Sequence, residues 1–230
     1  MIAMPCNEVL LALTERGRGQ HPIDRALTIL EAFTGRDRLA LAKLSLAQRD
    51  ALLIAARTMM FGPQLSCALP CSACGEAIEL VIRFDEPVPF DERGDATVVY
   101  KGRTYAIRAP DSFDAAAILT CADVRVARTA LALRCIGADV ADDTLVDAID
   151  AALGQACAFA TIDCRVACPA CGAGIDAPLC VESVLWTELD WHAERLIDDI
   201  VVLAARFGWG EAEVLALPES RREHYVRAAG

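Results

Sequence analysis

The sequence is poor in aromatic residues and lacks the long apolar run that a membrane-spanning helix needs. Phenylalanine, tryptophan and tyrosine together make up 6% of the 230 residues, whereas apolar residues as a whole make up 55%. No apolar stretch approaches the roughly 18 residues of a transmembrane helix, so we expect none. The abundance of alanine and leucine instead favours helices that pack closely together.

A basic region ahead of an apolar stretch, which would mark a secretory signal peptide, is also missing. The opening residues, MIAMPCNEVLLALTERGRG, carry an acid at Glu8 and no basic residue before their apolar stretch. We therefore expect a cytoplasmic protein without membrane association.

Basic residues are outnumbered over most of the chain, and the net charge is −11. Residues 1–60 hold eight Lys and Arg against six Asp and Glu, but residues 61–230 hold fourteen against twenty-seven. An acidic surface repels phosphate backbones, so the composition disfavours nucleic acid as a partner. It is compatible with binding a basic face of another protein, and equally with solubility alone.

Common catalytic motifs are absent as well. The three histidines, His21, His192 and His224, lie far apart in the sequence. The chain has no Gly-rich phosphate loop, G-x-S-x-G elbow or H-E-x-x-H pair. We therefore expect no enzymatic activity and no small-molecule substrate.

Cysteine, in contrast, is plentiful. Eleven cysteines in a reducing compartment do not predict a disulfide framework. Four of them form two C-x-x-C-G units. The other seven lie among apolar neighbours, and we expect them to be small core residues, as free cysteines often are. These seven are Cys6, Cys67, Cys121, Cys135, Cys157, Cys164 and Cys180.

Each C-x-x-C-G unit predicts half of a metal site. Zinc prefers tetrahedral thiolate coordination, and a C-x-x-C turn lets two sulfurs reach one ion. The glycine after each pair permits the close turn that this geometry needs. We predict one structural, non-catalytic zinc site with four ligands, although the 93 residues between its halves exceed the usual spacing of a zinc ribbon. The ligands are Cys71, Cys74, Cys168 and Cys171.

Two other uses of these cysteines remain open at this point. Rubredoxin-type iron is bound by the same turns, so the sequence does not separate zinc from iron. A thiol-redox protein would place one C-x-x-C where a strand opens into a helix. Here each pair is followed by a second strand-like stretch, which favours the metal site.

Hydrophobic periodicity predicts an α+β protein that is mostly helical. The four-cysteine zinc ribbon would form from two distant C-x-x-C-G hairpins, with a β-hairpin inserted between them. We expect three segments: an N-terminal helical segment (1–62), the ribbon halves with the insertion (63–180) and a C-terminal helical segment (181–230). The expected helices are 22–34, 46–60, 111–136, 142–159, 182–207 and 211–216, with another after Pro218. The expected strand pairs flank the cysteines at 64–84 and 162–179, and a further hairpin covers 97–109.

The order of these elements resembles one family. ERGRGQHPIDRAL, RDALLIAARTMMFGPQL leading into CSACGEAIEL, CPACGAGIDAPL, a W-T-E-L helix and the closing LAARFGWGEAEVLALPESRREHYV follow one another along nearly the whole chain. Together they resemble the hub and hub-assembly proteins of T-even-type contractile phage baseplates, including relatives in phage-tail-like contractile injection systems. Gly210 departs from the pattern, because Ser or Thr would be expected there as a helix cap.

The resemblance implies a non-enzymatic baseplate component or a chaperone-like assembly factor. Its partners would be other baseplate, hub or tail proteins, and the protein could be incorporated into the particle. The closing segment suggests partner-binding residues at Trp209, Glu211, Arg221, Arg222 and Tyr225. A zinc-ribbon adaptor of transcription or translation is the main alternative, and a thiol-redox protein is the other.

Overall fold

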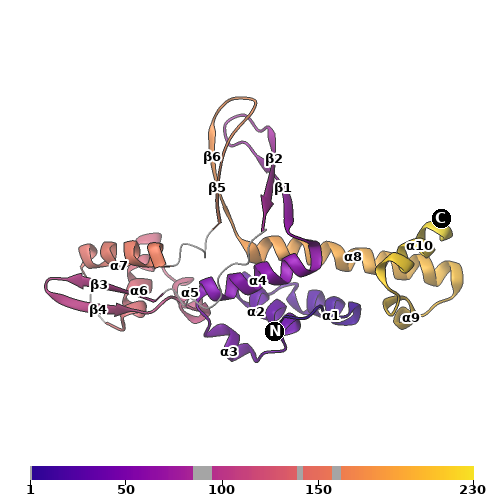
Figure 1. Cartoon of the computed structure of the whole chain (residues 1–230), viewed down its shortest axis with the longest axis horizontal. Coiled ribbons are helices and arrows are strands. Elements are labelled where there is room, and N and C mark those ends of the chain that lie inside the picture. Colours follow the sequence, from indigo (N-terminus) through magenta and orange to yellow (C-terminus); the bar gives the residue numbers. More distant parts are fainter. Residues whose placement is uncertain (1, 85–94, 139–141, 157–161) are drawn as a thin grey trace.

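A computed structural model describes residues 2–84, 95–138, 142–156 and 162–230. In this part of the chain the protein is mostly helical, with three separate two-stranded antiparallel sheets. The coarse prediction of an α+β fold is therefore confirmed. Figure 1 shows an elongated molecule in which two hairpins rise from a central group of helices, with smaller units at either end.

The helices lie in three stretches of the chain. The N-terminal stretch has α1 (Asn7–Gly17), α2 (Pro22–Thr34), α3 (Arg38–Ala42) and α4 (Leu46–Phe61). The middle stretch has α5 (Ser112–Ile118), α6 (Val124–Ile136) and α7 (Asp143–Ala156). The C-terminal stretch has α8 (Val181–Phe207), α9 (Glu211–Leu215) and α10 (Glu219–Ala229).

The strands form three hairpins, each paired only within itself. The first is β1 (Gln64–Pro70) with β2 (Ala77–Arg83), and the second is β3 (Ala96–Tyr100) with β4 (Arg103–Ile107). The third is β5 (Ile162–Ala167) with β6 (Gly174–Leu179). Hairpins one and three carry the two C-x-x-C-G units at their tips, and the second hairpin turns at Lys101 and Gly102 as expected.

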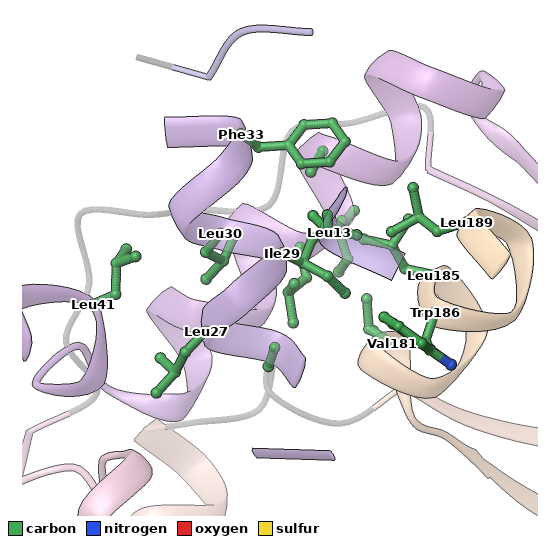
Figure 2. Close-up of a cluster of buried hydrophobic side chains, with 14 of the residues drawn as sticks. Leu13, Leu27, Ile29, Leu30, Phe33, Leu41, Val181, Leu185, Trp186 and Leu189 are labelled. Atoms are coloured by element: carbon green, nitrogen blue, oxygen red, sulfur yellow. The ribbon is translucent and has the colours of Figure 1, made fainter. Parts of the chain in front are cut away.

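The main core joins helices from the two ends of the chain. Leu30 and Phe33 of α2 are buried against α1, α4 and the first turns of α8, where Leu185 and Leu189 contribute. Figure 2 shows these side chains converging from both ends of the sequence. Burying large apolar side chains of this kind contributes about 1.5–3 kcal/mol each, so this core fixes where the hairpins are rooted.

A second core lies in the inserted unit, which comprises residues 95–138 and 142–156. Ile107 of β4 and Ile149 of α7 are fully buried there, packed with residues of α6. The unit is tied to the main helices where Ser45 and Asp111 form a β-bridge and the Leu46 amide donates to the Pro110 carbonyl at 2.8 Å.

Two helices were missed, and one predicted helix is divided. Helices α1 and α3 were not expected, and the helix predicted over 111–136 is interrupted between α5 and α6. Asp123 restarts the helix there by accepting a hydrogen bond from the Val126 amide at 2.9 Å. The last residues of the helix predicted over 142–159 lie outside the described residues.

The other expected helices are present. Helix α4 begins with a capping box at Ser45 and Gln48, and α8 ends at Gly208 with φ 72°. No helix in the described ranges combines the length and the apolar character needed to cross a bilayer. The division of the chain at residues 62 and 180 stays a prediction.

Candidate metal centre

The two C-x-x-C-G units occupy equivalent turns. The last paired residues are Pro70 with Ala77 in the first hairpin and Ala167 with Gly174 in the third. Each turn therefore starts at the first cysteine of its unit, directly after a strand. The register places both units at hairpin tips that are far apart in the sequence and adjacent in space (Figure 1).

The backbone repeats the same two hydrogen bonds in both turns. The Cys71 amide donates to the Glu76 carbonyl at 2.8 Å, and the Gly75 amide donates to the Cys71 carbonyl at 2.9 Å. In the other turn, the Cys168 amide donates to Ala173 and the Gly172 amide to Cys168, both at 2.8 Å.

Both turns need a glycine after the second cysteine. Gly75 has φ 76° and Gly172 has φ 73°, a left-handed conformation that costs other residues about 1–2 kcal/mol. The glycines that the sequence pointed to are therefore required by the backbone.

The four sulfurs form one compact group. One Sγ from each of Cys71, Cys74, Cys168 and Cys171 lies within 4.8 Å of all the others. The Sγ atoms of Cys71 and Cys171 are 3.7 Å apart, as are those of Cys74 and Cys168. A tetrahedron with metal–sulfur bonds of about 2.3 Å has edges of about 3.8 Å, so the group has the size of a four-thiolate site.

The centre is buried on one side and open on the other. Cys71 and Cys168, the first cysteine of each pair, are 3% and 2% exposed, whereas Cys74 and Cys171 are exposed. Ile78 is buried beside the first cysteines, and residues of the third hairpin pack against it. This apolar patch holds the two tips together below the sulfurs.

The pKa values of two of the four thiols, Cys71 and Cys74, shift in opposite directions. The amides of Ala73 and Cys74 donate to the Cys71 sulfur and lower the pKa of that thiol to about 7. The Glu76 amide lowers the pKa of Cys74, but the neighbouring thiols, Cys171 first, outweigh it and raise that pKa to about 12. Adjacent sulfurs cannot all become thiolates without a cation, so the group suits a divalent metal ion.

An arginine fixes the base of the first hairpin. Arg57 of α4 is 4% exposed and forms two hydrogen bonds with the Glu188 carboxylate of α8, at 2.7 and 3.0 Å. It also donates to the carbonyls of Gly62 at 2.7 Å and Gln64 at 2.8 Å. The guanidinium thus connects the end of α4, the start of β1 and α8.

A second ion pair lies where the third hairpin enters α8. Glu182 is 3% exposed, and its carboxylate lies 2.9 Å from the Arg25 guanidinium. Burial raises the pKa of Glu182, although the charge of Arg25 opposes the shift. Arg25 also lies 5.0 Å from the centre of the Trp186 ring. A buried arginine, Arg57, therefore sets the root of the first hairpin, and a half-buried one, Arg25, sets the root of the third.

The five predicted partner-binding residues do not share one environment. Trp209 and Tyr225 are half-buried, and their rings meet edge to face at 5.0 Å. Glu211 and Arg221 are exposed. Arg222 is 3% exposed and donates to Asp199 at 2.8 Å, so its side chain is used inside the molecule.

The expectation that the remaining cysteines fill the core holds only in part. Cys135 is buried, but Cys6 and Cys180, each the N-cap residue of a helix, are exposed. Cys67 and Cys121 are half-buried. Cys157 and the side chain of Cys164 lie outside the described residues.

Sequence reasoning missed the arginines at the hairpin roots. Both arginines pair with residues of α8 more than 100 positions away, so no local pattern in the sequence indicates these contacts. No family model, curated protein or solved structure matches this chain in sequence or in fold.

Proposed function

We propose that this chain is a non-enzymatic assembly protein stabilised by one structural zinc ion. It would act as a baseplate component or as an assembly factor of a contractile phage tail or phage-tail-like injection particle. The observation that carries the zinc site is the group of four sulfurs brought within 4.8 Å by two distant hairpins.

The site fits a structural metal better than a catalytic one. Four protein thiolates fill the coordination shell of zinc, which leaves no position for a substrate or an activated water. The bound ion would supply charge neutralisation for the sulfurs and a fixed connection between the two hairpin tips. Iron in a tetrahedral thiolate site has the same ligand set, so the metal has to be identified by analysis.

The assembly role is supported by where the resembling segments meet. Gly17, Arg25 and Arg57 come from N-terminal segments, and Trp186 and Glu188 come from the W-T-E-L helix. The structure places them in contact around the hairpin roots. The segments that carry the family resemblance thus contact one another at one junction. This supports the proposal that they form a single scaffold, as an assembly protein would need.

A thiol-redox function has one observation in its favour, the lowered pKa of Cys71. Reactive thiols of oxidoreductases have similarly lowered pKa values. Both C-x-x-C units, however, return into strands and meet each other, and neither opens a helix. Metal analysis distinguishes the two functions, because a redox protein would be isolated without stoichiometric metal.

The first test is metal content by elemental analysis of the purified chain. We expect one zinc ion per chain, with Cys71→Ser losing it and aggregating more readily than the unmodified protein, because the apolar patch beneath the sulfurs is uncovered. Structural zinc sites contribute binding energies on the order of 10 kcal/mol, which act as folding energy. Cys121→Ser, at a half-buried thiol outside the group, is the matched control and is expected to keep its zinc. A Cys71→Ser chain that lacks zinc yet stays soluble, with both cysteine hairpins still folded, would contradict the structural role.

The second test concerns assembly. Genes for sheath, tube and spike proteins beside this one, followed by co-purification with their hub or baseplate products, are the expected result. A chain that instead co-purifies with a polymerase or with ribosomes would favour the adaptor function. Loss of the gene is expected to stop baseplate formation while leaving the individual tail proteins soluble.

A further inference from the structure

The second half of α8 exposes large apolar side chains along one side. Trp191 is 58% exposed, Ile197 42% and Val201 61%, whereas Leu196 and Leu203 of the same helix are buried. Ile197 and Val201 are four residues apart and so are neighbours on the helix surface. Figure 1 shows this part of α8 running from the base of the hairpins toward α9 and α10.

Three acidic residues run through the same surface. Asp190, Glu194 and Asp198 follow one another at intervals of four residues, which places like charges next to each other. Each such pair costs a helix roughly 0.2–0.5 kcal/mol. Arg18, the residue that follows α1, offsets the first two, at 3.1 Å from Asp190 and 4.0 Å from Glu194. Asp198 is exposed and has no ion pair within the described part of the chain.

We propose that this surface, the α8 face, binds a basic amphipathic helix of another protein. The α8 face consists of Trp191, Glu194, Ile197, Asp198 and Val201. Apolar side chains of such a helix would cover the exposed tryptophan, isoleucine and valine, and its lysines or arginines would neutralise the acidic row. The partner would thereby remove the repulsion within α8 as well as the exposed apolar surface.

The charges favour this partner over the other candidates. A second copy of the chain would bring two acidic rows together on a molecule whose net charge is already −11. Nucleic acids and anionic membranes would be repelled for the same reason. Arg195 does not change the sign of the surface, because it lies 5.0 Å from the centre of the Trp191 ring and forms an ion pair with Glu223 at 3.4 Å.

The geometry favours a helix over an extended segment. The exposed residues form two adjacent rows on one helix, Trp191–Glu194–Ile197 and Asp198–Val201, each at intervals of three, and rows of this kind pack into the grooves of a second helix. An extended strand would need a free sheet edge, which a helix does not offer. The proposed binding of a helix to the α8 face depends neither on a bound metal nor on the protein being part of a phage-tail particle.

The test uses the full chain as purified and a synthetic peptide. The probe is a Leu/Lys amphipathic helix of about 18 residues, and the matched control replaces every Lys with Glu. Titration calorimetry at physiological salt is expected to show binding of the Lys peptide alone. The peptide should also shift the tryptophan emission to the blue, and Trp191→Phe should lose most of that shift.

Matched variants show whether binding occurs at the α8 face. Asp198→Lys and Val201→Asp are each expected to weaken binding about tenfold, or about 1.4 kcal/mol. Glu79→Lys, at an exposed acid on β2, makes the same charge change elsewhere. Val99→Asp, at a valine of β3 that is 71% exposed, makes the same apolar-to-acid change elsewhere.

Both control variants are expected to bind the Lys peptide as tightly as the unmodified chain. Circular dichroism and metal content should be unchanged in all four substituted chains. If Glu79→Lys and Val99→Asp weaken peptide binding as much as the variants of the α8 face do, the peptide is held by general charge attraction, and the proposal is overturned. A dimer in light scattering that Val201→Asp converts to monomer would assign the α8 face to a second copy and also overturn it. Absence of zinc in the purified chain would contradict the proposed function and leave this test unaffected.

Discussion

At the scale of single residues, the contact between α1 and α8 depends on a glycine. Gly17 is buried at the end of α1, and a Cβ there would overlap the ring of Trp186. We expect Gly17→Ala to destabilise the protein by about 1–3 kcal/mol, as overpacking of a core does. Chemical denaturation followed by circular dichroism measures the effect.

Gly154 of α7 provides the matched control. It also lies in a helix, but a Cβ there meets nothing within 4 Å. Because alanine has the higher helix propensity, Gly154→Ala is expected to stabilise the chain by about 0.5–1 kcal/mol. Equal effects from the two substitutions would mean that the Trp186 contact does not limit the close approach of α1 and α8.

Asp114 couples stability to pH. Its carboxylate is fully buried and accepts hydrogen bonds from Arg108 at 2.8 Å and Arg134 at 2.7 Å. Burial alone would raise the pKa of Asp114, but these bonds and the Asp111 amide lower it below its ordinary value. Because the folded-state pKa is lowered, the carboxylate stabilises the fold above its unfolded pKa of about 3.9, and this contribution is lost as pH falls through the folded value.

We therefore expect Asp114→Asn to cost about 2 kcal/mol at neutral pH. The difference from the unmodified chain should shrink as pH falls below about 4, where the carboxyl begins to be protonated in the unfolded state but stays charged in the folded state. Denaturation curves recorded from pH 3 to 7 measure both effects. Asp123→Asn, at an exposed helix cap, should show little change, since asparagine caps helices as well as aspartate does. A difference for Asp114→Asn that stays constant with pH would contradict the role of this carboxylate.

At the scale of elements, the position of the first hairpin depends on Arg57. Its bonds join α4, β1 and α8, and lysine lacks the planar fork needed to make all of them. Arg57→Lys is expected to cost about 3 kcal/mol and to speed amide exchange at the start of β1. Arg16→Lys, at an exposed ion pair with Glu31, should change stability by less than about 0.5 kcal/mol. A smaller loss of stability for Arg57→Lys than for Arg16→Lys would show that Arg57 does not hold the first hairpin in position.

Elements with strong local signals were predictable, and elements defined by distant contacts were not. Ser45 and Gly208 mark the ends of α4 and α8 in the sequence, and both were correctly placed. Helix α1 is stabilised by packing on α2 and α8, and the opening residues alone do not indicate those contacts. The interruption at Asp123 was missed because the apolar pattern continues through it, although Leu119 and Val124 are exposed.

The candidate site shows the same difference. The four cysteines and the two glycines after them were identifiable, since each C-x-x-C-G turn is a local structure. That they meet across 93 residues was a chemical inference, supported by the ligand number that zinc prefers. The partners of Arg25 and Arg57 lie on α8, more than 100 positions away, and nothing in the local sequence indicates them.

At the scale of the whole molecule, the four-cysteine group completes a closed circuit of packed elements. Helix α4 leads into the first hairpin and the third hairpin leads into α8, while α4 and α8 pack against each other in the main core. The sulfurs join the two hairpins at the opposite end of the circuit. The four-cysteine group and the main core belong to distinct clusters of buried residues.

Removal of the metal is therefore expected to separate the hairpins before it unfolds the helices. A zinc chelator with a thiol reductant should increase amide exchange in residues 64–83 and 162–179, while α2, α4 and the first half of α8 stay protected. Far-ultraviolet circular dichroism should change little, and the open strand edges should then promote slow aggregation. Cys71→Ser is the control, because a chain without the metal should not respond to the chelator. Simultaneous loss of protection in hairpins and helices would show instead that the metal site and the core unfold as one unit, since a two-state transition leaves no partly protected species.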